Sequence, residues 1–124
     1  MSMEDNSSAD RQPKNGVTPL ESEARLDAFV SETNVALVEF YTDSCGICQS
    51  MEPVLGNLAR QLDVAVGTVN PRNDPPLIER FDVRSVPLFV LFVDGEAIAR
   101  RAEGFISGDD LAAWIEAEAD AGEK

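Results

Sequence analysis

The sequence has no histidine, only two cysteines and one tryptophan among its 124 residues. A structural zinc site needs four ligands, mostly cysteine and histidine, so two cysteines would need a second chain and carboxylates to complete one. We therefore expect no metal. The apolar runs are far shorter than the roughly 18 residues that span a bilayer, so no membrane segment is expected. No G-x-G-x-x-G fingerprint is present, which argues against a bound nucleotide or flavin.

Basic residues are also scarce: ten lysines and arginines face 23 acidic residues, for a formal net charge of −13. This excess disfavours nucleic acid and anionic membrane surfaces as partners, because both would repel the protein. The charge is either a general solubility device or, as we favour, an adaptation to a high-salt cytoplasm in which repulsion is screened.

The first residues, Met1–Asn6, are acidic and polar and do not have the basic and then apolar order of a secretory signal. We therefore predict a cytoplasmic location. In a reducing compartment, a single cysteine pair is more often catalytic or redox-sensing than structural.

The two cysteines follow an apolar run, Val35–Tyr41, that is typical of a buried strand. A helical stripe comes after them, with apolar residues at spacings of three and four: Met51, Val54, Leu55, Leu58 and Leu62. Cys45 and Cys48 thus lie where a strand leads into a helix, three residues apart on one turn. Their Cα atoms can fall within the roughly 4.4–6.8 Å that a disulfide requires.

A helix start also makes the two sulfurs chemically unequal. Free backbone N–H groups and the positive end of the helix dipole favour the thiolate of Cys45. Cys48 lies one turn deeper, where this field is weaker and water is scarcer. Such a pair suits thiol–disulfide exchange, in which one sulfur attacks and the other resolves the mixed disulfide.

Glu39 is the one charged residue in an otherwise apolar strand. A carboxylate in such a strand is costly to bury unless it is paired or protonated. It either meets a polar gap or an arginine, or serves as a partly buried acid that exchanges protons with Cys48. We favour the second interpretation.

The chain divides into a disordered polar tail (1–16), one domain (17–120) and a frayed end (121–124), with fraying expected from Glu116 onward. The first helix has two possible starts. Thr18 can cap it, with Pro19 at the first helical position, or Ser22 can cap it and leave Val17–Leu20 as an edge strand.

Proline, glycine and helix-capping residues later in the chain predict the boundaries of the remaining elements. Residues 70–73 are expected to form a loop, and Asp74-Pro75-Pro76 to cap a short helix through Phe81. Asp94-Gly95 predicts a two-residue hairpin turn, Gly104 a bend or bulge, and Ser107 the cap of the last helix. Pro53 should kink the helix that follows the cysteines. The order (β)αβαβαββα predicts an α/β fold with a central mixed sheet of four to five strands and helices on both faces.

These features together resemble thioredoxin over about residues 17–120. The resemblance rests on Val38–Cys48, Met51-Glu52-Pro53, Ser85-Val86-Pro87 and Phe92–Glu96. A lone C-x-x-C is a weak signal, but here a strand precedes it, a helix containing proline follows it, and a Val-Pro pair comes about forty residues later.

The resemblance implies roles for individual residues. Cys45 would be the attacking nucleophile, Cys48 the resolving thiol and Glu39 the family's buried acid. A cis Val86–Pro87 bond would face the cysteines, and the Val86 backbone would pair with an extended substrate segment. The remaining residues expected at the active site or substrate surface are Tyr41, Ser44, Gly46, Ile47 and Gly104.

Three positions depart from the usual family pattern. Ser44 stands where the family usually has tryptophan, Ile47 where it usually has proline, and Thr68 where a lysine often partners the buried acid. Ile47 restores a backbone N–H near Cys45, which would stabilise the thiolate and hence the reduced form. A protein whose reduced form is more stable is a stronger oxidant in its disulfide form. We therefore predict a less reducing potential than is usual for the family.

The function expected from these residues is thiol–disulfide oxidoreduction. A monomeric protein would reduce disulfides of client proteins and be recharged by a separate reductase. It would need no cofactor, because the dithiol carries both electrons. The alternative is a redox-sensing or binding module on the same fold without efficient turnover, which the altered residues Ser44 and Ile47 keep open.

Overall fold

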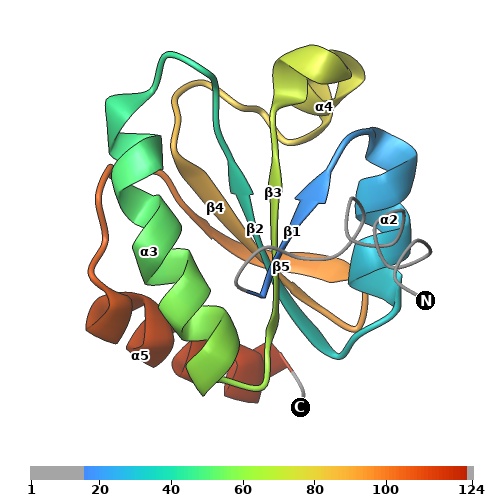
Figure 1. The fold of residues 1–124 in the computed structure, drawn as a ribbon. Helices are drawn as coiled ribbons and strands as arrows, with labels where there is room; N and C mark the ends of the chain where they lie inside the picture. The colour runs from blue at the N-terminus through green and yellow to red at the C-terminus, as the bar shows by residue number, and fades with distance from the viewer. Residues whose placement is uncertain (1–15, 123–124) are drawn as a thin grey trace, which may run out of the picture.

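The computed structural model of the chain describes residues 16–122. Figure 1 shows a central twisted sheet with helices packed on both sides. The strands are β1 (Val17–Leu20), β2 (Val35–Phe40), β3 (Ala65–Val69), β4 (Leu88–Val93) and β5 (Glu96–Arg101). The helices are α2 (Glu23–Ser31), α3 (Gly46–Gln61), α4 (Pro76–Arg80) and α5 (Gly108–Gly122), with a 3₁₀ turn at Pro71–Asn73. The predicted order of strands and helices is confirmed.

The sheet has the order β1-β3-β2-β4-β5 and is mixed. β1, β3 and β2 run parallel, whereas β4 is antiparallel to both β2 and β5. β2 therefore lies at the centre, between a parallel and an antiparallel neighbour. The predicted α/β class with a mixed sheet is confirmed, and β2, the strand that leads to the cysteines, has a neighbour on each side.

Side chains alternate between the two faces of the sheet, as the period of a strand requires. On β2, Val38 and Phe40 pack into a core beneath α2 and α4, together with Leu26, Leu77 and Phe92. Leu37 points the other way, into a core beneath α3 and α5. Alternation places Glu39 on this second face, next to α3.

The first helix begins at the second of the two predicted starts. Ser22 is its N-cap, and the Ser22 hydroxyl accepts a hydrogen bond from the N–H of Arg25 at 3.1 Å. Val17–Leu20 forms the edge strand β1, in which Pro19 lies opposite Thr68 of β3. The start at Thr18 is therefore wrong, because these residues pair with β3 instead of entering the helix.

The predicted turns are present. Asp94 and Gly95 both have positive φ angles, of 53° and 85°, as a tight hairpin turn between β4 and β5 requires. Gly104 has φ 92° at the bend after β5, a conformation that favours glycine. Ser107 accepts a hydrogen bond from the N–H of Asp110 at 3.1 Å, as expected of a helix cap.

Several local expectations need correction. The Asp74 side chain does not cap α4: its Oδ2 accepts from the N–H of Glu23 at 2.8 Å and so ties this loop to the start of α2. Residues 71–73 form a 3₁₀ turn rather than an open loop, because the Asn70 side chain accepts from the N–H of Arg72.

The ends of the chain differ in what can be compared. α5 continues to Gly122, so the fraying expected from Glu116 is not seen over the described part of that segment. The predicted disordered tail lies outside the described residues except for Gly16, as do residues 123–124. Pro53 is inside α3 as predicted, and its kink stays a prediction. Across residues 16–122, no helix combines the length and the apolar character needed to cross a membrane.

Candidate active site

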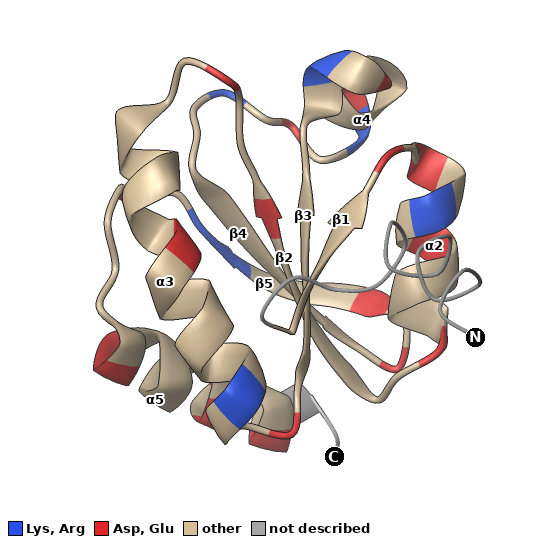
Figure 2. Cartoon of the chain, viewed as in Figure 1, with Lys and Arg blue, Asp and Glu red and all other residues tan. Residues whose placement is uncertain are grey.

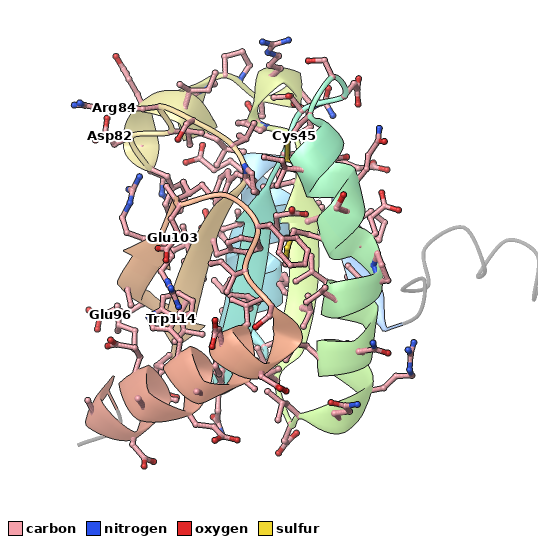
Figure 3. The ribbon with its side chains drawn as sticks, turned by 90° about the vertical axis from the view of Figure 1, so that its left-hand side faces the viewer. Cys45, Asp82, Arg84, Glu96, Glu103 and Trp114 are labelled. Atoms are coloured by element: carbon pink, nitrogen blue, oxygen red, sulfur yellow. A yellow bond between two sulfur atoms is a disulfide. The ribbon has the colours of Figure 1, made fainter. Side chains whose placement is uncertain are left out.

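The cysteine turn connects the central strand to the longest helix. β2 ends at Phe40, and Cys45 is the N-cap of α3, which begins at Gly46. Cys45 and Cys48 form a disulfide with their Cα atoms 5.2 Å apart, within the range that the sequence predicts. Figure 3 shows Cys45 at the end of α3, remote from Trp114 of α5. The predicted position of both cysteines, on one turn at the start of a helix, is therefore the one observed.

The two sulfurs have different surroundings. Cys48 is buried, with 4% of its surface exposed, whereas Cys45 is half-buried. The Cys45 Sγ accepts a hydrogen bond from the N–H of Cys48 at 3.0 Å, so the first turn of the helix already directs a donor at this sulfur. Between them, Gly46 and Ile47 are exposed, as is Ser44 before them. The outer sulfur can meet a partner, and the inner one cannot without rearrangement.

Glu39 lies in the sheet beneath the disulfide with only 2% of its surface exposed. Its Oε2 atom has no hydrogen-bond partner, and it is the one fully buried side-chain oxygen or nitrogen in residues 16–122 of which this is true. The pKa of this carboxyl is raised to about 8. Burial is the main cause, and the negative charge of Glu52 is the second. Glu39 is therefore mostly protonated at neutral pH.

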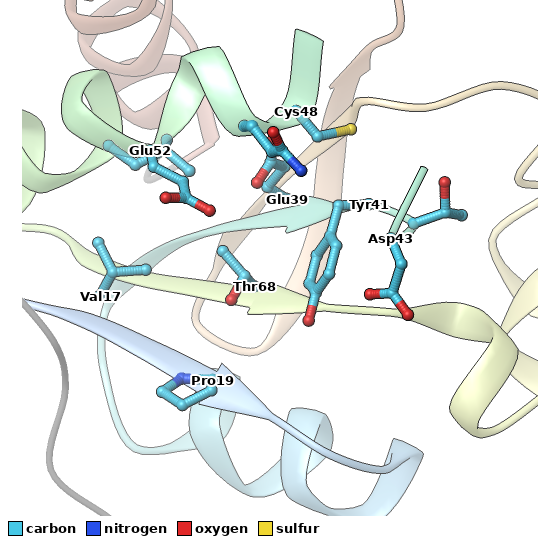
Figure 4. A pocket seen from close by; sticks show the side chains of 11 residues that line it. Val17, Pro19, Glu39, Tyr41, Asp43, Cys48, Glu52 and Thr68 are labelled. Atoms are coloured by element: carbon cyan, nitrogen blue, oxygen red, sulfur yellow. The ribbon is translucent and has the colours of Figure 1, made fainter. Parts of the chain in front are cut away.

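A pocket of about 350 Å³ opens beside Glu39 and Cys48. In Figure 4, Glu39 and Glu52 face the same space, with Tyr41 and Thr68 on the sheet below. The remaining lining residues are Val17, Pro19, Thr42, Asp43, Gln49 and Leu55. The pKa of Tyr41 is raised, first by burial and then by Asp43, Glu39 and Glu52. The pocket is acidic, and among residues 16–122 no lysine or arginine lines it.

Thr68 lies directly opposite Glu39 across the β2–β3 pair. It also lines the pocket, so the position at which the resemblance leads one to look for a lysine is next to the buried acid. A threonine there supplies no positive charge. Glu39 consequently keeps its proton more firmly than a carboxyl beside a cation would.

Glu52 is the residue of this site that the sequence analysis did not select. It lies four residues after Cys48, one turn along α3 and on the same side of the helix. That spacing was available from the sequence. An exposed glutamate on a helix is common and does not by itself indicate a site. Its relation to Glu39 becomes evident only in the structure, where both residues line one pocket.

The other predicted site residues come from the same end of the sheet. The Val86–Pro87 bond is cis, as the resemblance implies. Pro87 precedes Leu88, which pairs with Phe40 at the end of β2 from which the chain continues to Cys45. Gly104 follows β5, whose Arg101 pairs with Phe89 near that end. The topology therefore brings these segments to one end of the sheet.

Metal ligation has no support in the described part of the chain. No group of three or more histidine, cysteine, aspartate or glutamate side chains there is arranged to hold a metal ion. The carboxylates of the pocket thus do not form such a cluster.

A half-buried and a buried sulfur at a helix start, above a buried acid, define a protein of thiol–disulfide exchange. The comparisons with known proteins agree. The thioredoxin family model matches residues 17–117, and the chain belongs to the thioredoxin family. It is a thiol–disulfide oxidoreductase of the protein-disulfide reductase type.

Individual relatives span much of the domain. The chain is 35% identical over 80 residues to a thioredoxin of Chlamydia pneumoniae, covering 64% of this chain and 78% of that one. It is 32% identical over 92 residues to the chloroplastic thioredoxin Y2 of Arabidopsis thaliana, covering 73% of this chain and 54% of that protein. The structure of a mutant thioredoxin from Halobacterium salinarum NRC-1 superposes with a TM-score of 0.79 at 34% identity, covering 87% and 95% of the two chains.

Proposed function

We propose that this protein reduces disulfides of client proteins with Cys45 as the nucleophile and Cys48 as the resolving thiol. In the reduced protein, the Cys45 thiolate attacks a client disulfide and forms a mixed disulfide. Cys48 then attacks the Cys45 sulfur, which releases the client as a dithiol and leaves the Cys45–Cys48 disulfide. A separate reductase returns two electrons to that disulfide. Glu39, once it has lost its own proton, takes the proton of Cys48 during the second attack.

One observation carries this proposal: the unequal burial of two sulfurs on one helical turn. Cys45 is half-buried and receives an N–H donor at 3.0 Å, which stabilises negative charge on its sulfur. Cys48 is 4% exposed and lies beside the buried acid. The more accessible sulfur of Cys45 is thus prepared to attack, and the buried sulfur of Cys48 is close to the proposed proton acceptor.

Substrate contact is proposed for the surface around Cys45. Gly46 and Ile47 are exposed beside it, and Ile47 has 47% of its surface in solvent. The Val86 backbone, just before Pro87, would pair with an extended client segment. Ser44, Tyr41 and the bend at Gly104 would complete the surface on either side.

Turnover and trapping test the proposal. Wild-type protein should reduce insulin with dithiothreitol as the electron donor, and Cys45→Ser should abolish the reaction. Cys48→Ser should accumulate mixed disulfides on Cys45, from which mass spectrometry identifies the clients. Equal rates for wild type and Cys45→Ser would reject the enzyme and favour a redox-sensing or binding module.

We propose further that Ile47 makes the potential less reducing than is usual for the family. Ile47 keeps a backbone N–H in the first turn of α3, where it can stabilise the Cys45 thiolate once the disulfide is reduced. Equilibration with glutathione measures the potential. Ile47→Pro should lower it, whereas an unchanged or raised potential would contradict this account.

The high acidity supports a proposal about the environment in which the protein works. Acidic residues are spread over most helices and loops in Figure 2, and a relative of known structure is a thioredoxin from Halobacterium salinarum. We propose a monomer that works in a salt-rich cytoplasm. Its free energy of unfolding should then rise with salt concentration. Greatest stability in dilute buffer would argue against this.

A further inference from the structure

Glu39 needs a route to solvent that its own side chain does not provide. It is 2% exposed, and its Oε2 has no hydrogen-bond partner. A carboxyl that accepts a proton in each catalytic cycle must release it before the next cycle. Neither the strand that carries Glu39 nor the apolar face beneath it can accept that proton.

The pocket beside Glu39 supplies a second carboxyl. Glu52 lines the same space and is exposed to solvent on α3. Figure 4 shows both residues lining the pocket, and Glu39 is buried whereas Glu52 is exposed. The two carboxyl groups influence each other, because the Glu52 charge is the second cause, after burial, of the raised pKa of Glu39.

We propose that Glu52 is the residue through which Glu39 exchanges its proton with water. The inference rests on the proposed role of Glu39 as the proton acceptor for Cys48. Glu52 acts through Glu39 and does not touch the sulfurs, so it is a positioning residue for the proton rather than a catalytic residue.

The steps balance as follows for client release. Glu39 is mostly protonated at neutral pH, so it first passes its proton across the pocket to the Glu52 carboxylate, from which the proton reaches bulk water, and this step limits the attack. The Cys48 thiol then gives its proton to the Glu39 carboxylate, and the resulting thiolate attacks the Cys45 sulfur of the mixed disulfide. The Cys45–Cys48 bond forms, the bond from Cys45 to the client sulfur breaks, and the client leaves as a thiolate. Glu39 is then protonated again, and it loses this proton by the same route before the next cycle.

The other groups around Glu39 do not offer the same route. Tyr41, on the same strand, has a raised pKa and stays protonated at neutral pH. Asp43, in the loop after β2, also lines the pocket, but its charge is not among the causes of the raised pKa of Glu39, whereas the charge of Glu52 is. Thr68 of β3 does not titrate, and Val17 and Pro19 contribute only apolar surface. Glu52 is thus the carboxyl on the helix that also carries Cys48.

The test isolates the attack of Cys48 on a mixed disulfide. Reduced protein is mixed with Ellman's reagent in a stopped-flow instrument. The first thionitrobenzoate released reports attack by Cys45, and the second reports attack by Cys48. The second rate is followed between pH 6 and 9 at low and high concentrations of acetate buffer. The variants are Glu52→Gln, Glu52→Asp, Glu39→Gln and the control Asp63→Asn, which removes one exposed charge outside the pocket.

We expect Glu52→Gln to slow the second release by about tenfold or more in low buffer. This is less than the roughly 10²–10⁴-fold that a direct general acid or base contributes, because Glu52 acts through Glu39. Acetate, which is small enough for the pocket, should restore the rate, and Glu52→Asp should fall between wild type and Glu52→Gln. Electrostatics alone predicts the opposite sign. Removing the Glu52 charge lowers the pKa of Glu39, which leaves more of it ionised and able to accept a proton near pH 7.

Several results would overturn the inference. A wild-type rate for Glu52→Gln at every buffer concentration would do so, and so would an equal slowing by Asp63→Asn. If Glu39→Gln is slow while Glu52→Gln is not, the proposed role of Glu39 stands and only the route through Glu52 is wrong. If Glu39→Gln is also unimpaired, the role of Glu39 in the proposed function fails as well.

Discussion

The two faces of the sheet are built from the same strands but serve different purposes. The face beneath α2 and α4 is apolar throughout its buried core, with Phe40, Phe81 and Phe92 in contact. The face beneath α3 and α5 has an equally apolar core but ends, next to the disulfide, in the buried carboxyl of Glu39. The first face contributes stability, whereas the second includes a costly buried acid, for which we propose a role in proton transfer.

The charges outside each face follow the same division. Over α2 and α4, Arg80 pairs with Glu23 at 2.8 Å and with Asp27 at 2.9 Å. In the pocket beside α3, Glu39, Asp43 and Glu52 meet no basic side chain among the lining residues. Within residues 16–122, Glu23 and Asp27 over α2 and α4 are thus paired with a cation, whereas the acids of the pocket, where we propose proton transfer, are not.

The largest expected effect comes from truncating one phenylalanine on each face of β4. Phe92→Ala and Phe89→Ala both remove a ring that is no more than 2% exposed, and each should lower the free energy of unfolding by about 3–5 kcal/mol. Only Phe89 lies directly opposite Glu39. Phe89→Ala should therefore also admit water to Glu39 and lower its pKa, whereas Phe92→Ala should not.

Denaturant unfolding measures the two losses of stability, and carboxyl NMR of the folded protein follows the titration of Glu39. The comparison of the faces fails if both variants move the Glu39 midpoint equally. It also fails if either truncation costs little, since the cores would then not be tightly packed.

The second prediction concerns the cost of the buried acid itself. Glu39 has a pKa of about 8 when folded and an ordinary value of 4.5, so the folded protein binds its proton more tightly than the unfolded chain. This stability is complete below pH 4.5 and is lost as the pH rises through 8. Glu39→Gln removes the dependence. Between pH 5 and pH 8.5, wild type should lose about 4 kcal/mol relative to this variant.

Urea unfolding at several pH values provides that difference. Glu39→Gln should be the more stable protein at pH 8.5, because wild type then buries a carboxylate. Asp63→Asn, which changes an exposed acid, serves as the control and should follow wild type. Parallel pH curves for wild type and Glu39→Gln would mean that the acid is well solvated or paired when ionised.

Much of this molecule could be predicted from its sequence because its signals are local. The apolar run Val35–Tyr41, the Asp94-Gly95 turn and the stripe of α3 each determine their own element. The site followed from a spacing, with Cys45 and Cys48 on one helical turn. Glu39 stood out because its neighbours in the strand are apolar, and its burial is as predicted.

The errors arose where a residue's partner is distant in the chain. Asp74 looked like a helix cap, but its carboxylate bonds to the N–H of Glu23, 51 residues away. Thr18 is an acceptable helix cap by its local sequence, but in the structure it belongs to β1, which pairs with β3. Glu52 was missed for the same reason, since only the packing of α3 over β2 gives it access to the pocket of Glu39.

The smallest expected effect is on the paired charges over α2 and α4. Arg80→Gln removes both ion pairs, but these side chains are 34–51% exposed, so solvent screens them. The loss should be about 0.5–1 kcal/mol at low salt and should shrink further at high salt. Arg84→Gln, which breaks a more exposed pair with Asp82, is the matched control and should cost less still. A loss from Arg80→Gln that persists in high salt would show that the guanidinium also packs against the ring of Phe81, 4.8 Å away, and that this face depends on contact more than on charge.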